Sequence, residues 1–152
     1  MRTVDDIIAS KARPENIIHS DALVIDALHQ LDEVNLSYLI VMDDDSYKGV
    51  FSERDYSRNV VLKGRTSNST VIKDVMTVDL PVVAMTDTVE HCMTLMTRHK
   101  ARYLVAYDGK RFAGIITIHD LLRLVLANRA DVFDNTLAQN LIDTAEGRGR
   151  IY

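Results

Sequence analysis

Two short stretches of the sequence place a hydroxyl and a carboxylate at the same spacing. Residues 49–55 read GVFSERD and residues 114–120 read GIITIHD. Each stretch has a glycine, two apolar residues, a serine or threonine, and an aspartate three residues after the hydroxyl. In both, an apolar run of strand length ends at the hydroxyl and a helical pattern begins. The backbone N–H groups at a helix N-terminus are unpaired and the helix dipole is positive there, which suits a phosphate.

These residue types could bind two parts of a nucleotide. The hydroxyl of Ser52 or Thr117 can hydrogen-bond a phosphate oxygen, and an ionised Asp55 or Asp120 can accept from both hydroxyls of a ribose. The glycine permits a tight turn or a close approach of the backbone to a ligand. The same spacing also forms a capping box, which only satisfies the first N–H groups of the helix. Two copies in one register favour ligand binding, and a hydroxyl can serve both roles.

The two stretches belong to an internal repeat with an offset of 65 residues. The offset holds without a gap from residues 16–62 to residues 81–127, with 8 identities in 47 positions. Within each copy, apolar residues at helical spacing precede two apolar runs of strand length, and a second helical pattern follows. The sequence predicts helices at about 24–31, 53–62, 89–96 and 118–127, and strands at about 38–41, 49–51, 103–106 and 114–116.

The repeat predicts an α/β (α+β) fold of two βαββα units packed as one pseudo-symmetric module, because one unit alone buries too small a core. The expected boundaries are 4–62 for the first repeat, 63–71 for a polar linker, 72–127 for the second repeat, and 128–152 for a C-terminal helix and tail. Residues 5–9 and 73–76 are expected to form short helical entries to the first and second units.

Composition limits the class of protein. The net charge is -4, so no basic excess exists to bind nucleic acid. No apolar run approaches the roughly 20 residues that cross a bilayer, and no secretory signal is visible, so we expect a cytoplasmic protein without membrane contacts. With one cysteine, no HExxH pattern and no EF-hand spacing, we expect neither a metal site nor a disulfide within the chain.

The duplicated motif, the gap-free repeat and the stretches SERDYSR and VMT at residues 52–58 and 75–77 resemble a tandem pair of cystathionine-β-synthase (CBS) domains. The resemblance covers about residues 4–127, and these stretches are similar to those of stand-alone bacterial CBS-pair proteins. It implies a non-catalytic regulatory module in signal transduction. Two clefts between the repeats would bind AMP, ADP, ATP, an NAD-type dinucleotide or S-adenosylmethionine. It also implies a homodimer that acts on a regulated protein, whose identity the sequence leaves open.

The resemblance also assigns residues to the two clefts. Ser52 and Asp55 would contact phosphate and ribose in the first cleft, and Thr117 and Asp120 in the second. Val50 and Ile115 match residues that flank the adenine, and Arg102 matches a basic position near the phosphates. The opposing walls would be Thr77, Pro81 and Val82 in the first cleft and Ile17, Ile18 and Ser37 in the second.

The two clefts differ in charge at one position. Arg54 carries a permanent positive charge, whereas its counterpart His119 is charged only below about pH 6.5. This comparison predicts that the Asp55 cleft prefers the more phosphorylated ligand. Two alternatives remain: a protein-interaction scaffold with vestigial clefts, and a nucleotide-hydrolysing enzyme, for which the sequence offers no second clustered carboxylate. We therefore expect no catalytic residue.

Overall fold

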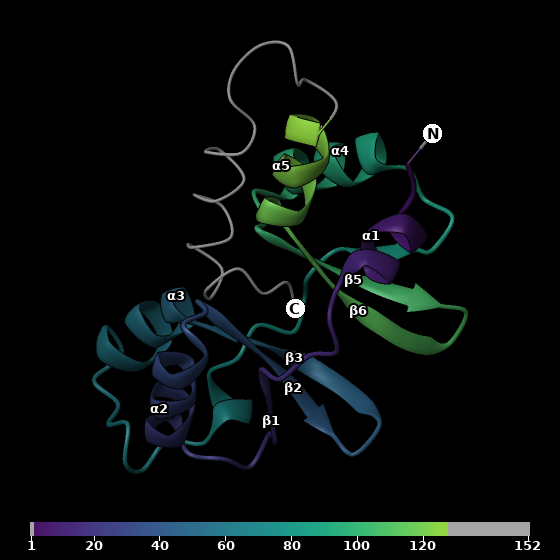
Figure 1. Cartoon of the computed structure of the whole chain (residues 1–152). Helices are drawn as coiled ribbons and strands as arrows, with labels where there is room; N and C mark the ends of the chain where they lie inside the picture. Colours follow the sequence, from purple (N-terminus) through teal and green to yellow (C-terminus); the bar gives the residue numbers. More distant parts are fainter. Residues whose placement is uncertain (1, 128–152) are drawn as a thin grey trace. The chain divides into compact units, whose positions relative to one another are not determined.

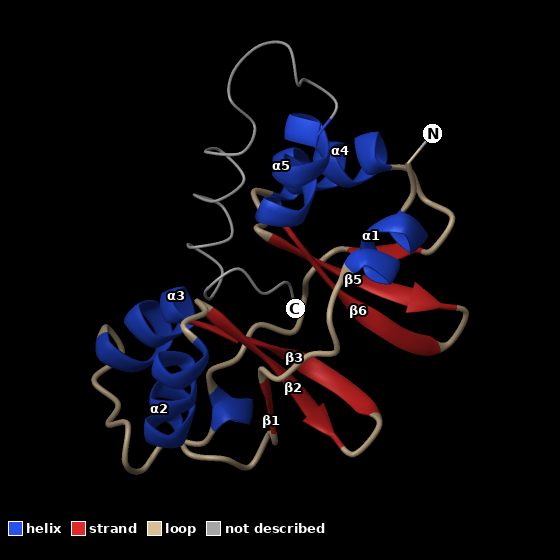
Figure 2. Ribbon diagram, viewed as in Figure 1, coloured by secondary structure: helices blue, strands red, loops and turns tan. Residues whose placement is uncertain are grey.

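The structure is a computed structural model that describes residues 2–127 (Figure 1). It has two three-stranded sheets of identical topology, each flanked by helices (Figure 2), which confirms the mixed α+β fold. The C-terminal helix expected over residues 128–152 lies outside the described residues. Among residues 2–127, no helix has both the length and the apolar character to cross a membrane.

The first sheet has the order β1-β2-β3, in which β1 runs parallel to β2 and β2 antiparallel to β3. Its strands are β1 (Ile17–Ile18), β2 (Tyr38–Asp43) and β3 (Ser46–Ser52). Helix α2 (Val24–Val34) connects β1 to β2. After β3 the chain continues into the short helix α3 (Glu53–Asp55) and then the π-helical segment η1 (Tyr56–Val61), so the helix expected over 53–62 is present but is mostly π-helical.

The second sheet repeats this arrangement 65 residues later. Its strands are β4 (Val82–Ala84), β5 (Tyr103–Asp108) and β6 (Arg111–Thr117), with the order β4-β5-β6. Helix α4 (Val89–His99) connects β4 to β5, and α5 (Ile118–Ala127) follows β6. Both connecting helices end on a left-handed residue, Asn35 and Lys100, at equivalent positions of the repeat. The predicted repeat therefore extends to the helix caps.

The chain forms two compact units that do not coincide with the sequence repeats. We call residues 13–79 the Asp55 unit, and the described residues 2–12 and 80–127 the Asp120 unit. Helix α1 (Val4–Ser10) belongs to the Asp120 unit, although it precedes the first repeat. The 3-10 turn η2 (Ile72–Asp74) belongs to the Asp55 unit, although it follows the linker. The two short helical entries are therefore exchanged relative to the expectation.

Burial of small apolar faces explains this exchange. Val4 and Ile7 are fully buried in the core of the Asp120 unit, and the Val4 N–H donates to the Asp87 carbonyl at 2.9 Å. Ile72 is fully buried in the core of the Asp55 unit, and its N–H donates to the Ala22 carbonyl at 2.9 Å. Each short element precedes one repeat in the sequence but fills the core of the unit that contains the other repeat.

Candidate functional site: two carboxylates at the strand-to-helix turns

The Asp55 carboxylate lies at the turn from β3 into α3, in a cluster of neutral hydrogen-bond donors. Oδ2 accepts from the backbone N–H of Ser52 at 2.9 Å and from its hydroxyl at 3.1 Å. Oδ1 accepts from the Thr77 hydroxyl at 2.7 Å and, at 3.5 Å, from the amide of Asn59. Both Ser52 and Asp55 are buried. We call these four residues the Asp55 cluster.

Backbone pairing holds Thr77 beside this carboxylate. The N–H groups of Val50 and Thr77 each donate to the other's carbonyl, at 3.0 and 2.9 Å. This close approach needs a glycine at position 49, because a Cβ there would lie 2.6 Å from the Thr77 carbonyl oxygen. The glycine of the motif therefore admits the chain's own backbone in the Asp55 unit.

Burial sets the protonation behaviour of Asp55. Loss of solvation raises the pKa of the Asp55 carboxyl above its ordinary value of 3.8, because burial penalises the charged form. Hydrogen bonds from Thr77 and Ser52 and the positive charge of Arg54 act in the opposite direction without cancelling the effect. The Asp55 cluster thus holds a carboxylate whose negative charge is poorly compensated.

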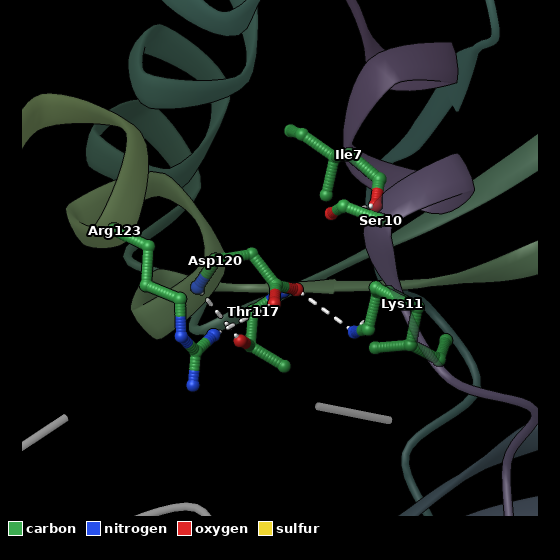
Figure 3. Close-up of polar contacts among 7 residues, drawn as sticks. Ile7, Ser10, Lys11, Thr117, Asp120 and Arg123 are labelled. Carbon is green, nitrogen blue, oxygen red and sulfur yellow. Dashed lines mark hydrogen bonds and ion pairs between the residues drawn. The ribbon is translucent and has the colours of Figure 1, made fainter. Parts of the chain in front are cut away.

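The Asp120 carboxylate, at the turn from β6 into α5, has charged partners instead (Figure 3). Oδ2 accepts from the Thr117 N–H at 2.8 Å and from the Lys11 ammonium at 2.8 Å. Oδ1 accepts from the Arg123 guanidinium at 3.3 Å. The side chains of Lys11, Asp120 and Arg123 are 6%, 3% and 10% exposed, so both ion pairs are buried. We call these four residues the Asp120 cluster.

Helix α1 positions Lys11. Its last turn ends at Ser10, and Lys11 is the C-cap residue in an extended conformation. The Lys11 ammonium also donates to the carbonyl of Ile115 on β6 at 2.7 Å, so it is fixed at two points. Lys11 therefore occupies, in the Asp120 unit, the place that Thr77 occupies in the Asp55 unit.

Both motifs also cap their helices. The Ser52 hydroxyl accepts from the Asp55 N–H, and the Thr117 hydroxyl accepts from the Asp120 N–H, each at 3.2 Å. In return each aspartate accepts from the N–H of its hydroxyl residue. The capping role is thus present twice, and the spacing of the motif alone does not separate it from ligand binding.

The other predicted site residues lie as follows. Val50 and Ile115 are buried in the last strand of their sheets, and Arg54 and Arg102 are exposed. His119 is half-buried in the first turn of α5. Thr77 contacts Asp55 directly. None of the remaining proposed wall residues belongs to the same unit as the carboxylate of its cleft. Pro81 and Val82, assigned to the cleft of Asp55, belong to the Asp120 unit, and the residues assigned to the cleft of Asp120 belong to the Asp55 unit: Ile17, Ile18 and Ser37. Their assignment to the clefts stays a prediction.

Three residues of the two clusters were not assigned to a site from the sequence: Lys11, Asn59 and Arg123. The sequence does place Ser10-Lys11 where the second repeat has Met76-Thr77, but this was interpreted only as a departure from the family pattern. Arg123 aligns with Arg58 in the repeat, but Arg58 is exposed and Arg123 is buried. The pattern of the repeat therefore hides a difference in the partners of the two carboxylates.

Metal binding and thiol chemistry depend on other side chains of the described residues. Within residues 2–127, no group of three or more His, Cys, Asp or Glu side chains is arranged to hold a metal ion. Cys92 is fully buried in the core of the Asp120 unit, and burial raises the pKa of its thiol to about 11. A thiol in this environment is a core residue and a poor nucleophile.

Comparisons with known proteins agree with the duplicated architecture. The family model described as CBS domain matches residues 4–61 and 72–127. A putative signal-transduction protein with CBS domains from Burkholderia ambifaria MC40-6 has a similar structure. It is 35% identical, with a TM-score of 0.76, over 84% of this chain and 96% of that one. CBSX2, solved in complex with AMP, is 26% identical, with a TM-score of 0.68, over 85% of this chain and 99% of that one.

Among curated proteins, the mitochondrial CBS domain-containing protein CBSX3 of Arabidopsis thaliana is 28% identical over 133 residues. That match covers 82% of this chain but only 65% of the relative's own length. The two family matches together extend over most of the described residues, and each contains one strand–hydroxyl–carboxylate motif. The chain belongs to the CBS-domain family, as a protein with a tandem pair of CBS domains.

Proposed function

We propose that this chain is a non-catalytic regulatory module that binds an adenosine-containing ligand through its two carboxylate clusters. AMP, ADP, ATP and NAD-type dinucleotides are the candidate ligands. In this proposal Asp55 and Asp120 accept from ribose hydroxyls, and the hydroxyls and N–H groups of Ser52 and Thr117 serve the phosphate. Ligand occupancy would then bias the conformation that a regulated protein recognises, which requires different affinities for two states.

The observation that carries this proposal is the presence, in both units, of a buried carboxylate beside a hydroxyl at the start of a helix. Burying two aspartates only to cap two helices is unusual, because exposed caps work equally well and burial penalises the charge. The solved complex of CBSX2 with AMP supports an adenosine ligand for a related chain.

Thermal unfolding with a ligand series tests the proposal. Adenosine, AMP, ATP, NADH and S-adenosylmethionine are each added to the full chain. A ligand at about a hundred times its dissociation constant should stabilise the native state by about 2.7 kcal/mol. Asp55→Ala should reduce the effect, while Asp45→Ala, an exposed residue of the β2–β3 turn, should not. If no ligand raises the unfolding midpoint, the proposed function is wrong.

One observation favours the alternative of a protein-interaction scaffold. Both carboxylates already have partners within the chain, and Asp120 has two buried cations. A scaffold with vestigial clefts would need no ligand to satisfy these groups. It would show no midpoint shift with any of the five compounds, whereas a sensor would respond to at least one. Analysis of the nucleotides after incubation tests the hydrolase alternative, for which we expect no product.

Homodimerisation is the second part of the proposal. Four large apolar side chains are exposed on the segments that follow the two motifs: Val61 and Leu62 at the end of η1, and Ile118 and Leu122 on α5. Leu62 is 77% exposed. Exposed apolar groups of this kind often mark protein–protein contacts. Light scattering on the full chain should give twice the monomer mass, and a monomer at all concentrations would contradict this part.

A further inference from the structure

We propose that Asn59 is a positioning residue that couples the binding of a ribose at Asp55 to the conformation of η1. A ribose displaces the Asn59 amide from the carboxylate, and η1 then changes from a π-helical to an α-helical turn. This inference rests on the proposed function, because it concerns the regulation of the Asp55 cluster. It goes beyond that function by naming the segment that responds to the ligand.

The side chain of Asn59 joins η1 to the chain segment that precedes Thr77. Its amide nitrogen donates to the Val75 carbonyl at 2.9 Å and, at 3.5 Å, to Oδ1 of Asp55. The Asn59 carbonyl in turn accepts from the Arg65 guanidinium at 3.1 Å. Through Asn59, a change at the Asp55 carboxylate therefore reaches the backbone of η1.

Binding of a ribose requires donors to leave Asp55. An ionised carboxylate has about four lone-pair sites, and four donors occupy them: the N–H and hydroxyl of Ser52 on Oδ2, and Thr77 and Asn59 on Oδ1. On Oδ2 the Ser52 hydroxyl can rotate away, whereas its N–H is fixed by the backbone. On Oδ1 the contact of 3.5 Å from Asn59 is much weaker than that of 2.7 Å from Thr77. A ribose therefore displaces Asn59 at the smallest cost.

The second repeat provides the alternative conformation. The residues that align with η1 lie in α5, which is a regular α-helix. There the third residue after the carboxylate, Arg123, contacts Asp120, whereas in η1 the fourth residue, Asn59, contacts Asp55. The π-helical turn thus keeps Asn59 on the face of the carboxylate. Because π-helical turns are rare and less regular than α-helical ones, loss of this contact favours the α-helical form.

A change in η1 moves an exposed apolar surface. The Leu62 N–H closes the wide turn by donating to the Ser57 carbonyl, five residues earlier, at 3.0 Å. In an α-helical turn it would instead donate to the carbonyl of Arg58, four residues earlier, and the residues that follow would rotate about the helix axis. Val61 and Leu62 are both exposed there. These side chains, which are proposed above as dimer contacts, therefore report whether a ribose occupies Asp55.

NMR on the full chain tests this coupling, with AMP as the ligand and 2′,3′-dideoxy-AMP as the matched compound without ribose hydroxyls. The scalar coupling across a hydrogen bond identifies the carbonyl that accepts from the Leu62 N–H. Without ligand, this carbonyl should be that of Ser57. With saturating AMP, the coupling to Ser57 should be lost and a coupling to Arg58 should appear. The dideoxy compound should leave the coupling to Ser57 in place.

The variant Asn59→Ala should separate binding from the response. Calorimetry should show AMP binding within about threefold of wild type, because the displaced contact is weak. The Leu62 N–H should have the same acceptor with and without AMP. Asn68→Ala, the matched change in an exposed turn of the same unit, should respond as wild type does. Asp55→Asn should give no response in η1, because it removes the ribose acceptor.

One outcome that overturns the coupling needs no variant: wild type binds AMP while the Leu62 N–H keeps Ser57 as its acceptor. A response that persists in Asn59→Ala or in Asp55→Asn, or loss of AMP binding in Asn59→Ala, would also overturn it. All of these outcomes leave the proposed function intact. If AMP does not bind the wild-type chain, this inference fails, and if no compound of the ligand series binds, the proposed function fails as well.

Discussion

Replacing Asp120 by Asn should destabilise the protein much more than the matched replacement of Asp55. Asn keeps the shape of Asp but has no charge, so Asp120→Asn removes the carboxylate with which the buried side chains of Lys11 and Arg123 both form ion pairs. The new amide oxygen can still accept from the Thr117 N–H, so the helix cap is retained. The expected loss therefore reports the two ion pairs and not the cap.

The magnitude follows from the contacts of each carboxylate. Removing one partner of a buried ion pair costs about 3–5 kcal/mol, because the other charge stays out of water. In Asp55→Asn, the amide can accept from the Ser52 N–H and donate to the Thr77 hydroxyl. About one neutral hydrogen bond is then lost, worth about 1 kcal/mol. The two variants should thus differ by about 2–4 kcal/mol in their free energy of unfolding.

Urea unfolding followed by circular dichroism, without nucleotide, measures this difference. In thermal unfolding of the same variants, the midpoint of this chain of 152 residues should fall by about 2–4 °C for each kcal/mol lost from the free energy of unfolding. Adding Lys11→Met to Asp120→Asn should cost less than the sum of the two single changes, because it removes a charge that is already unpaired. Equal destabilisation by Asp55→Asn and Asp120→Asn, or strict additivity of the pair, would refute the reasoning.

Three further predictions concern single residues. Because burial raises the pKa of Asp55 above 3.8, its protonation stabilises the fold below that value, and this contribution is lost as pH rises through the folded-state pKa. Urea titrations at a series of pH values should therefore show Asp55→Asn gaining stability relative to wild type as pH rises above about 4, and a constant difference would contradict the raised pKa. Gly49→Ala should cost about 1–3 kcal/mol in urea unfolding, because its Cβ would meet the Thr77 carbonyl oxygen at 2.6 Å; unchanged stability would contradict that contact. Cys92, with a pKa of about 11, should react with a disulfide-exchange reagent at about pH 8 only after unfolding, and rapid labelling of the folded protein would contradict its burial.

The long elements were predictable because each has a period that only one kind of structure satisfies. Residues 24–31 and 89–96 have apolar side chains at helical spacing, and they lie in α2 and α4. The first strand of each βαββα unit was expected but was not located in the sequence, because the two residues of β1 and the three of β4 are too few to show an alternation.

The repeat in the sequence could not predict which unit α1 and η2 would join, for a different reason. Helix α1 has seven residues, of which Val4 and Ile7 are buried, and so small an apolar face does not specify which core it joins. Its position depends on tertiary contacts, such as the N–H of Asp5 donating to the Met85 carbonyl at 3.0 Å. Local periodicity contains no information on contacts between segments 80 residues apart. The partner that α1 delivers to Asp120 was therefore missed together with its position.

The two carboxylates differ because the helices that follow them differ. In α5, the regular helix places Arg123 on the same face as Asp120, three residues earlier, so the two side chains form an ion pair. In the Asp55 unit, the chain widens into the π-helical η1 directly after Asp55, and Asn59, four residues on, makes the contact. The aligned Arg58 is exposed. Two identical residues at one offset thus have different roles, since a change of helix type rotates one of them into solvent. The repeat preserved the carboxylates, while the helix type and the exchanged α1 changed the charges around them.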